Sequence, residues 1–346
     1  MITAIDFGCY EIRSAHRSIS NAGKIVLTTE RSEYTILPNE ATFADAVANE
    51  KIPYAVCEDS LVAFGSRASE VRWLSRKPSA PLFTDGQVPT QDAPARQILN
   101  VLTQSLLPAT NETSGVCCFT APGGRDARSS VEFLSRLIRM YGYQPEVCSV
   151  TEAINLASGS ETGFTCVTIC MGTERTEISV SRYGAEIATQ SVDVGSNWID
   201  TEFARQLKMQ VWDDTGESYL DLEAVREWKH DPALHLRRSI GERARTLSRL
   251  YGVVLDAVAR TVRTLIDSPA VARVLKNARF TVNCSGGPTL IGGFAGALTE
   301  RFVEQDTASR ILAIRVVDNP EIAVVRGLLI HGELEARRSV PVQYAA

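Results

Sequence analysis

The sequence predicts an α/β protein made of two similar halves with a cleft between them. At 346 residues the chain is long enough for two ordinary domains. In the first half, the continuous apolar run 115–120 is typical of a strand buried on both faces, and a glycine turn and an amphipathic helix follow it. In the second half, the strand-like run 279–284 also leads into glycines and then a helix. A repeated unit of strand, glycine turn and helix is typical of a duplicated α/β fold.

The remaining elements follow from periodicity and from Gly, Pro and Asn punctuation. In the first half we expect strands at 25–29, 54–57 and 145–150, helices at 95–107, 125–141 and 152–159, and an exposed connection at 75–94. In the second half we expect strands at 165–169, 176–182, 186–194 and 311–317, and helices opening at 200–207 and covering 236–266, 293–304 and 319–335. The interval between residue 200 and the glycines after 284 is expected to be almost wholly helical.

Composition limits the possible functions. The apolar fraction of 44% and the charged fraction of 22% are those of an ordinary globular protein. A net charge of −5 argues against a nucleic-acid partner, which usually requires a basic face. No apolar run approaches the roughly 20 residues of a membrane span, and the chain begins with a strand-like segment rather than a leader. We therefore expect a cytoplasmic protein with no direct membrane insertion.

The eight cysteines include no CxxC pair and no metal-binding spacing with histidine. Most of them lie in apolar, strand-like runs, where a reduced thiol behaves as a small hydrophobic group. We expect buried reduced thiols, with neither a disulfide framework nor a zinc site.

Three short segments have the composition of phosphate-binding turns. They are the first turn (Asp6–Tyr10), the second turn (Cys170–Thr176) and the third turn (Cys284–Pro288). Polyphosphate is bound by backbone N–H groups at tight turns, where glycine lets the backbone approach closely. A carboxylate beside such a turn holds Mg²⁺, usually through water.

In this order and spacing, the three turns resemble the phosphate-1, phosphate-2 and adenosine motifs of the actin-like ATPase superfamily. The resemblance is greatest to the bacterial actin MreB and its relatives, such as the magnetosome actin. It extends along nearly the whole chain, through the segments 82–88, 121–124, 192–200 and 319–327. The resemblance implies an actin-like (ribonuclease H-like) ATPase fold, with two lobes around a nucleotide cleft.

The resemblance also implies roles for individual residues. Asp6 would hold Mg²⁺ through water and take part in catalysis, and Glu152 would orient the attacking water. The implied nucleotide-binding residues are Gly8, Cys9, Tyr10, Gly172, Thr173, Gly195, Ser285, Gly286 and Gly287. The implied cofactors are ATP or ADP and Mg²⁺.

The chain departs from the family pattern in the second turn. Cys170 stands where the second aspartate is usual, and Thr173 and Glu174 replace glycines. One reading is a turn that still binds phosphate with slow hydrolysis, and the other is a turn that no longer binds it productively. Asp6 as a turn cap, Glu152 as a solvated helix-start carboxylate and Gly286–Gly287 as a plain turn also stay open.

The resemblance suggests lobe I at 1–150, with an outer subdomain at about 30–80, and lobe II at 151–318. A C-terminal helix within 319–346 would return to lobe I. The outer subdomain of lobe II, at about 209–240, is expected to be reduced. Two registers there place either Lys229 or Glu242, in the segment Ile240–Arg243, near the ribose.

Two functions remain open at this point. The first is an actin-like protein that binds ATP between its lobes and assembles into filaments. The second is a non-polymerising or pseudo-ATPase scaffold. A sugar kinase would require an aspartate base that we do not find. The arginines between Arg237 and Arg263 predict either a solvated helix face or a contact with an acidic protein partner.

Overall fold

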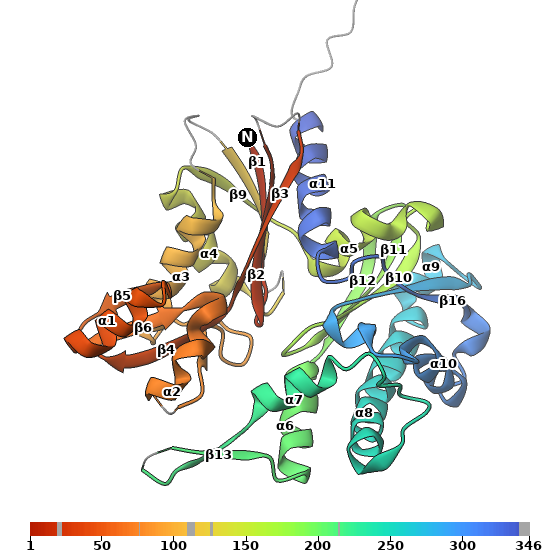
Figure 1. The fold of residues 1–346 in the computed structure, drawn as a ribbon. Helices are drawn as coiled ribbons and strands as arrows, with labels where there is room; N and C mark the ends of the chain where they lie inside the picture. Colours follow the sequence, from red (N-terminus) through yellow and green to blue (C-terminus); the bar gives the residue numbers. More distant parts are fainter. Residues whose placement is uncertain (19–22, 76, 109–114, 125–126, 214, 339–346) are drawn as a thin grey trace, which may run out of the picture. The chain divides into compact units, whose positions relative to one another are not determined.

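The computed structural model describes residues 1–18, 23–75, 77–108, 115–124, 127–213 and 215–338. The chain divides into two compact units (Figure 1). Unit 1 comprises Met1–Ser149 and the residues from Val324 onward, and unit 2 comprises Val150–Ala323. Each unit has its own hydrophobic core.

The main sheet of unit 1 has five strands in the order β3-β2-β1-β8-β9. Their bounds are β1 Ile2–Phe7, β2 Glu11–Arg17, β3 Ile25–Arg31, β8 Gly115–Thr120 and β9 Tyr143–Val147. The strands β1, β2 and β3 form an antiparallel meander, and β1, β8 and β9 are parallel.

Helices cover both faces of this sheet. The helices α3 (Ala93–Leu106) and α4 (Arg128–Met140) share a core with Phe7 and Phe119, which meet edge to face. On the other face α11 (Ala323–Arg338) comes so close at Gly332 that a Cβ there would lie 2.8 Å from the sulfur of Cys118.

A second, smaller sheet in unit 1 has the strand order β5-β6-β4-β7. Its strands are β4 Glu33–Pro38, β5 Tyr54–Cys57, β6 Ser60–Phe64 and β7 Ala80–Pro81. The short helices α1 (Ala41–Asn49), η1 (Gly65–Val71) and α2 (Arg72–Ser75) accompany it. Leu37, Val47 and Leu61 centre its small core.

Unit 2 repeats the topology of the main sheet, in the order β12-β11-β10-β15-β16. Its strands are β10 Cys166–Met171, β11 Thr176–Arg182, β12 Ala185–Val192, β15 Phe280–Ser285 and β16 Ile311–Val316. Again three strands form an antiparallel meander and three are parallel. The predicted duplicated α/β fold is therefore confirmed.

The helices of unit 2 begin and end as follows: α5 Val150–Ser158, η2 Gly159–Thr162, α6 Ser196–Gln206, α7 Leu222–Lys229, α8 Gly241–Ile266, α9 Pro269–Val274, η3 Gly287–Leu290, α10 Phe294–Glu304 and η4 Ala308–Arg310. The α8 helix buries an apolar stripe that includes Leu247, Val254 and Val258. This stripe belongs to the large core around β10, β11 and β15. The periodicity that predicts α8 therefore marks a core-facing helix.

Several predicted boundaries are wrong. The long helix begins at Gly241 rather than at residue 236. Ile240 is still extended, and the backbone turns into the helix at Gly241, which adopts a φ of +86°. The helix expected to open at 200 begins at Ser196, the closing helix begins at Ala323, and residue 150 opens α5 instead of ending a strand. The connection 75–94 is not simply exposed, since Leu82 and Phe83 are 0% and 1% accessible.

The interval 209–240 also differs from expectation. It contains a two-stranded hairpin, β13 (Gln210–Trp212) with β14 (Ser218–Leu220), followed by α7. Asp213 ties the hairpin together by accepting hydrogen bonds from Thr215 N, Thr215 Oγ1 and Glu217 N at 2.7–2.9 Å. Local polar bonds of this kind are not visible in hydrophobic periodicity.

Among the described residues, no helix is long and apolar enough to cross a membrane.

Candidate functional site

The first turn is a tight hairpin between β1 and β2 in unit 1. A Cβ at Gly8 would lie 2.5 Å from the carbonyl oxygen of Glu11, so only glycine fits. Ser32 holds the turn from outside: its hydroxyl donates to Gly8 O at 2.6 Å, and its backbone N–H donates to Tyr10 O at 2.9 Å. The guanidinium of Arg31 lies 4.3 Å from the centre of the Tyr10 ring. Gly8, Cys9 and Tyr10 are thus held in one defined backbone path.

Asp6 lies at the end of β1, beside this turn, and is 8% exposed. The hydroxyl of Thr120, on the parallel strand β8, donates to Asp6 Oδ1 at 2.7 Å. The guanidinium of Arg13, which also pairs with Glu11, lies 3.9 Å from Asp6 Oδ2. Burial raises the pKa of Asp6 above its ordinary value, although Arg13 and Thr120 oppose the shift. A buried carboxylate with this bias is stabilised by a nearby cation.

Replacing Asp6 with asparagine is expected to stabilise the nucleotide-free protein at neutral pH. Because the folded pKa is raised, folded Asp6 holds its proton more tightly than unfolded Asp6, so its burial costs stability above the folded pKa. This cost falls to zero as the pH drops below the unfolded value. The thermal midpoint of Asp6→Asn should therefore exceed that of wild type at pH 7.5, and the gap should close towards pH 4.

The measurement is thermal unfolding of both proteins in EDTA across that range. Thr120→Val is the comparison variant, because it keeps the Asp6 carboxylate but removes the hydroxyl that stabilises its ionised form. A gap that widens at low pH would contradict the assignment.

The second turn joins β10 to β11 in unit 2 and is closed by a bond from Gly172 N to Arg175 O at 2.9 Å. The N-terminus of α6 packs directly on it: Ser196 N donates to Gly172 O at 3.0 Å, and Asn197 N donates to Thr173 O at 2.9 Å. A Cβ at Gly195 would lie 2.3 Å from Thr173 O. Gly172, Thr173 and Gly195 therefore pack together, and their binding of a nucleotide stays a prediction.

The third turn follows β15 and lies against the second. A Cβ at Gly286, whose φ is +100°, would lie 2.1 Å from Met171 O, on the strand that leads into the second turn. Ser285 is fully buried and donates to Pro320 O at 2.9 Å. A Cβ at Gly287 would meet no heavy atom within 4 Å. The third turn is thus closely packed at Gly286 and open at Gly287.

Comparisons with known proteins identify the family and the fold of this chain. A family model described as Volactin matches residues 1–332. The chain belongs to the Volactin family. A search of curated protein sequences found no match.

Solved structures place this Volactin-family chain in the actin-like fold. The alignment with the MamK double helical filament covers 98% of this chain and 99% of the MamK chain, with a TM-score of 0.69 at 14% identity. MreB5 of Spiroplasma citri bound to AMPPNP covers 97% of each chain, with a TM-score of 0.67 at 14% identity. The ethanolamine utilization protein EutJ from Carboxydothermus hydrogenoformans covers 95% of this chain and 88% of its own, with a TM-score of 0.54 at 15% identity. The predicted actin-like fold and resemblance are confirmed.

The departure at Cys170 lies where it affects the second turn directly. Cys170 is half-buried near the end of β10, with Glu177 and Ser285 opposite it on the two neighbouring strands. Arg175 forms an ion pair with Asp193 at 2.8 Å. A thiol therefore stands at the position where the superfamily pattern has an aspartate, with a glutamate and a serine opposite it on the neighbouring strands.

Glu152 lies in the first turn of α5, which opens unit 2 and packs on β10 and β11. Its neighbour Thr151 is buried, and the Thr151 hydroxyl donates to Glu186 at 2.5 Å. The carboxylate itself is half-buried. Its role in orienting water stays a prediction.

The two candidates for a ribose contact differ in environment. The ammonium of Lys229 forms an ion pair with Asp200, which is 2% exposed and also lies 3.6 Å from Arg226. Glu242 lies exposed in the first turn of α8. The charge of Lys229 therefore compensates a buried carboxylate within unit 2, and a ribose contact by either residue stays a prediction.

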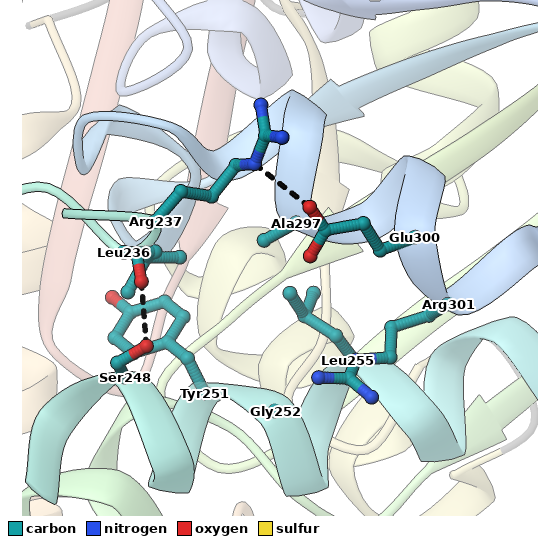
Figure 2. Close-up of a pocket in the computed structure, with 9 residues that line it drawn as sticks. All are labelled: Leu236, Arg237, Ser248, Tyr251, Gly252, Leu255, Ala297, Glu300 and Arg301. Atoms are coloured by element: carbon teal, nitrogen blue, oxygen red, sulfur yellow. Dashed lines mark hydrogen bonds and ion pairs between the residues drawn. The ribbon is translucent and has the colours of Figure 1, made fainter. Parts of the chain in front are cut away.

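A cavity of about 230 Å³ lies between α8, α10 and residues 236–237, and Arg237 is the arginine of the arginine-rich segment among the described residues that line it (Figure 2). Arg237 forms an ion pair with Glu300 at 2.8 Å, and Arg301 lies 3.6 Å from Asp256. Arg237 and Arg238 precede α8, so the predicted continuous helix face is wrong at its start. Glu300 and Asp256 therefore neutralise part of the arginine charge around this cavity. A contact with an acidic protein partner stays a prediction.

Sequence reasoning missed Thr120 and Ser32 as supports of the first turn. Thr120 is separated from Asp6 by 114 positions, and only the parallel pairing of β1 with β8 brings them together. A threonine that ends an otherwise apolar buried strand is the one available signal, because a buried hydroxyl requires a partner.

Proposed function

We propose that this chain binds ATP or ADP with Mg²⁺ at its three turns and assembles into filaments. The observation that carries the proposal is the second turn packed on the third at Gly286 and on the start of α6 at Gly195, in a fold whose solved members include nucleotide complexes. Such turns offer backbone N–H groups to phosphate oxygens. Gly287 leaves open space, which suits the close approach of a nucleotide.

We assign the Mg²⁺ position to Asp6, acting through water. The carboxylate is buried beside the first turn, and this burial raises the pKa of Asp6, so a further cation nearby would stabilise its ionised form. Mg²⁺ would neutralise charge on the transferred phosphate. Arg13, within reach of Asp6, would add a second positive group on the same side. The donor set is incomplete, because Cys170 supplies no carboxylate.

Slow hydrolysis follows from this incomplete set. The loss of one carboxylate that positions the hydrated cation corresponds to a few kcal/mol of transition-state stabilisation, or roughly a hundredfold in rate. Filaments that turn over slowly would then persist in the ATP-bound state. The filament part of the proposal is supported by the likeness to MamK, which has been solved as a double helical filament.

The deciding experiment is high-speed pelleting of purified protein with Mg-ATP, Mg-ADP or no nucleotide, with phosphate release followed in parallel. ATP-dependent pelleting with slow release is the expected result. Pelleting without any release would indicate filaments in which nucleotide is structural. If neither occurs, the scaffold function, favoured by Cys170 and the small hairpin region 210–220, replaces the proposal.

Replacing Glu152 with glutamine is expected to lower the rate of phosphate release by at least about a hundredfold. An amide keeps the size of the side chain but cannot accept a proton from water. Nucleotide affinity, measured by equilibrium binding of a fluorescent ATP analogue, should change less than about threefold.

The matched control for this variant is Glu161→Gln, which alters an exposed carboxylate in η2 that pairs with Arg315. Equal loss of hydrolysis in both variants would remove Glu152 from the proposed site.

A further inference from the structure

The outer strand of the main sheet in unit 1 has an unprotected edge. In the described part of the chain, β3 is the last strand on its side of the sheet (Figure 1). Ile25, Val26 and Leu27 are 41%, 38% and 42% exposed, and Thr28 and Thr29 continue the exposed stretch. Native edge strands usually carry a charge, a proline or a bulge that prevents pairing. Residues 25–29 carry none of these.

The backbone pattern identifies which groups face outward. Lys24 O accepts from Ser18 N, and Ser32 N donates to Tyr10 O, so even-numbered residues bond towards β2. The backbone groups of Ile25, Leu27 and Thr29 therefore point away from the sheet. At the far end, Arg31 N donates to Ser66 Oγ at 3.2 Å, on the outer side. The open edge thus extends from residue 25 to residue 29.

We propose that this edge pairs antiparallel with the same edge of a second copy, about a two-fold axis at Leu27. Leu27 would then lie opposite Leu27 of the second copy, and Ile25 opposite Thr29. These are outward-facing residues on both strands, as a hydrogen-bonded antiparallel pair requires. The two five-stranded sheets would form one continuous sheet, in a closed dimer with one self-complementary interface.

Charges at the ends of the edge favour this register. With the axis at Leu27, Lys24 lies opposite Glu30 of the second copy at both ends. Glu30 accepts hydrogen bonds from Ser66 N and Ser66 Oγ of its own chain at 2.9 Å, which fixes its carboxylate at this end of the edge, and directly opposed unlike charges stabilise a strand pair. Moving the axis to Thr29 would place Arg31, whose N–H is bonded to Ser66, opposite Leu27. The contact uses none of the residues of the three turns. It therefore goes beyond the proposed function and requires no nucleotide.

Position 27 permits a charge test, because it is the one position that meets itself across the axis. Analytical ultracentrifugation without nucleotide, in EDTA, should show a reversible monomer–dimer equilibrium for the wild type. Leu27→Lys and Leu27→Glu should each raise the dimer dissociation constant at least about tenfold, since like charges oppose one another. An equimolar mixture of the two variants should recover dimers, which also shows that both are folded.

The control is Met140→Lys, which places the same charge at a 73% exposed position at the end of α4. It should dimerise as the wild type does. A wild type that stays monomeric, a Leu27→Lys variant that dimerises normally, or a mixture that stays monomeric would each overturn the proposal.

Discussion

Replacing Cys170 with aspartate is expected to raise the rate of ATP hydrolysis roughly ten- to a hundredfold. The half-buried position near the end of β10 lies beside Gly172, where the actin-like pattern places its second aspartate. A second carboxylate there would complete the set that holds hydrated Mg²⁺. The gain depends on Asp6, so Asp6→Asn should remove it. Steady-state phosphate release by the four proteins of this double-mutant cycle measures the effect.

Cys170→Ser is the matched control, because it introduces a small polar group without charge. It should leave hydrolysis within about threefold of the wild type. If serine and aspartate give the same rate, the second turn does not organise the cation, and the scaffold function gains support. The cross-strand neighbour Glu177 is the main risk to folding, since it lies opposite position 170. A thermal midpoint for Cys170→Asp should therefore accompany the rates.

Replacing Gly286 with alanine is expected to destabilise unit 2 by about 3 kcal/mol or more. The φ of +100° is unfavourable for any residue with a side chain, and the added Cβ would lie 2.1 Å from Met171 O. Met171 is fully buried in β10, so its carbonyl has no room to retreat. Urea unfolding should show a lower midpoint, and loss of soluble protein would be the extreme form of the same result.

Gly287 supplies a control for this substitution at the adjacent position. Its Cβ would meet no heavy atom within 4 Å, and its φ is not positive, so Gly287→Ala should leave stability within about 0.5 kcal/mol. Under the proposed function, Gly287→Val should weaken ATP binding at least about tenfold while the protein stays folded. Unchanged binding in that variant would place the nucleotide elsewhere. Equal destabilisation by alanine at 286 and 287 would contradict the packing argument.

The three turns could be predicted from sequence because their signals are local, and their role as a nucleotide site stays a prediction. The glycine of the first turn marks a place where the backbone meets the backbone a few residues away, as at Gly8 with Glu11. The apolar run at 115–120 marks a strand buried on both faces, and it forms β8 as expected. Both features can be recognised in a single sequence, because neither requires knowing which distant residues pack against them.

Boundaries and supports were harder to predict. The early start of α6 at Ser196 depends on Gly195 packing under Thr173, and the hairpin at 210–220 depends on polar bonds to Asp213. The burial of Leu82 and Phe83 depends on a core assembled from distant strands. Hydrophobic periodicity records only the neighbours along one element.

By itself the sequence determined the duplicated α/β fold, the positions of the three turns and the presence of a cysteine rather than a carboxylate at position 170. The tertiary structure alone decided that the second turn lies on the third, that Thr120 reaches Asp6, and that Ile25 to Thr29 form an open edge. Turn geometry and strand burial are encoded within a few consecutive residues. Burial of a carboxylate or exposure of an edge depends on which distant segments pack beside it, and only the folded chain brings those segments together.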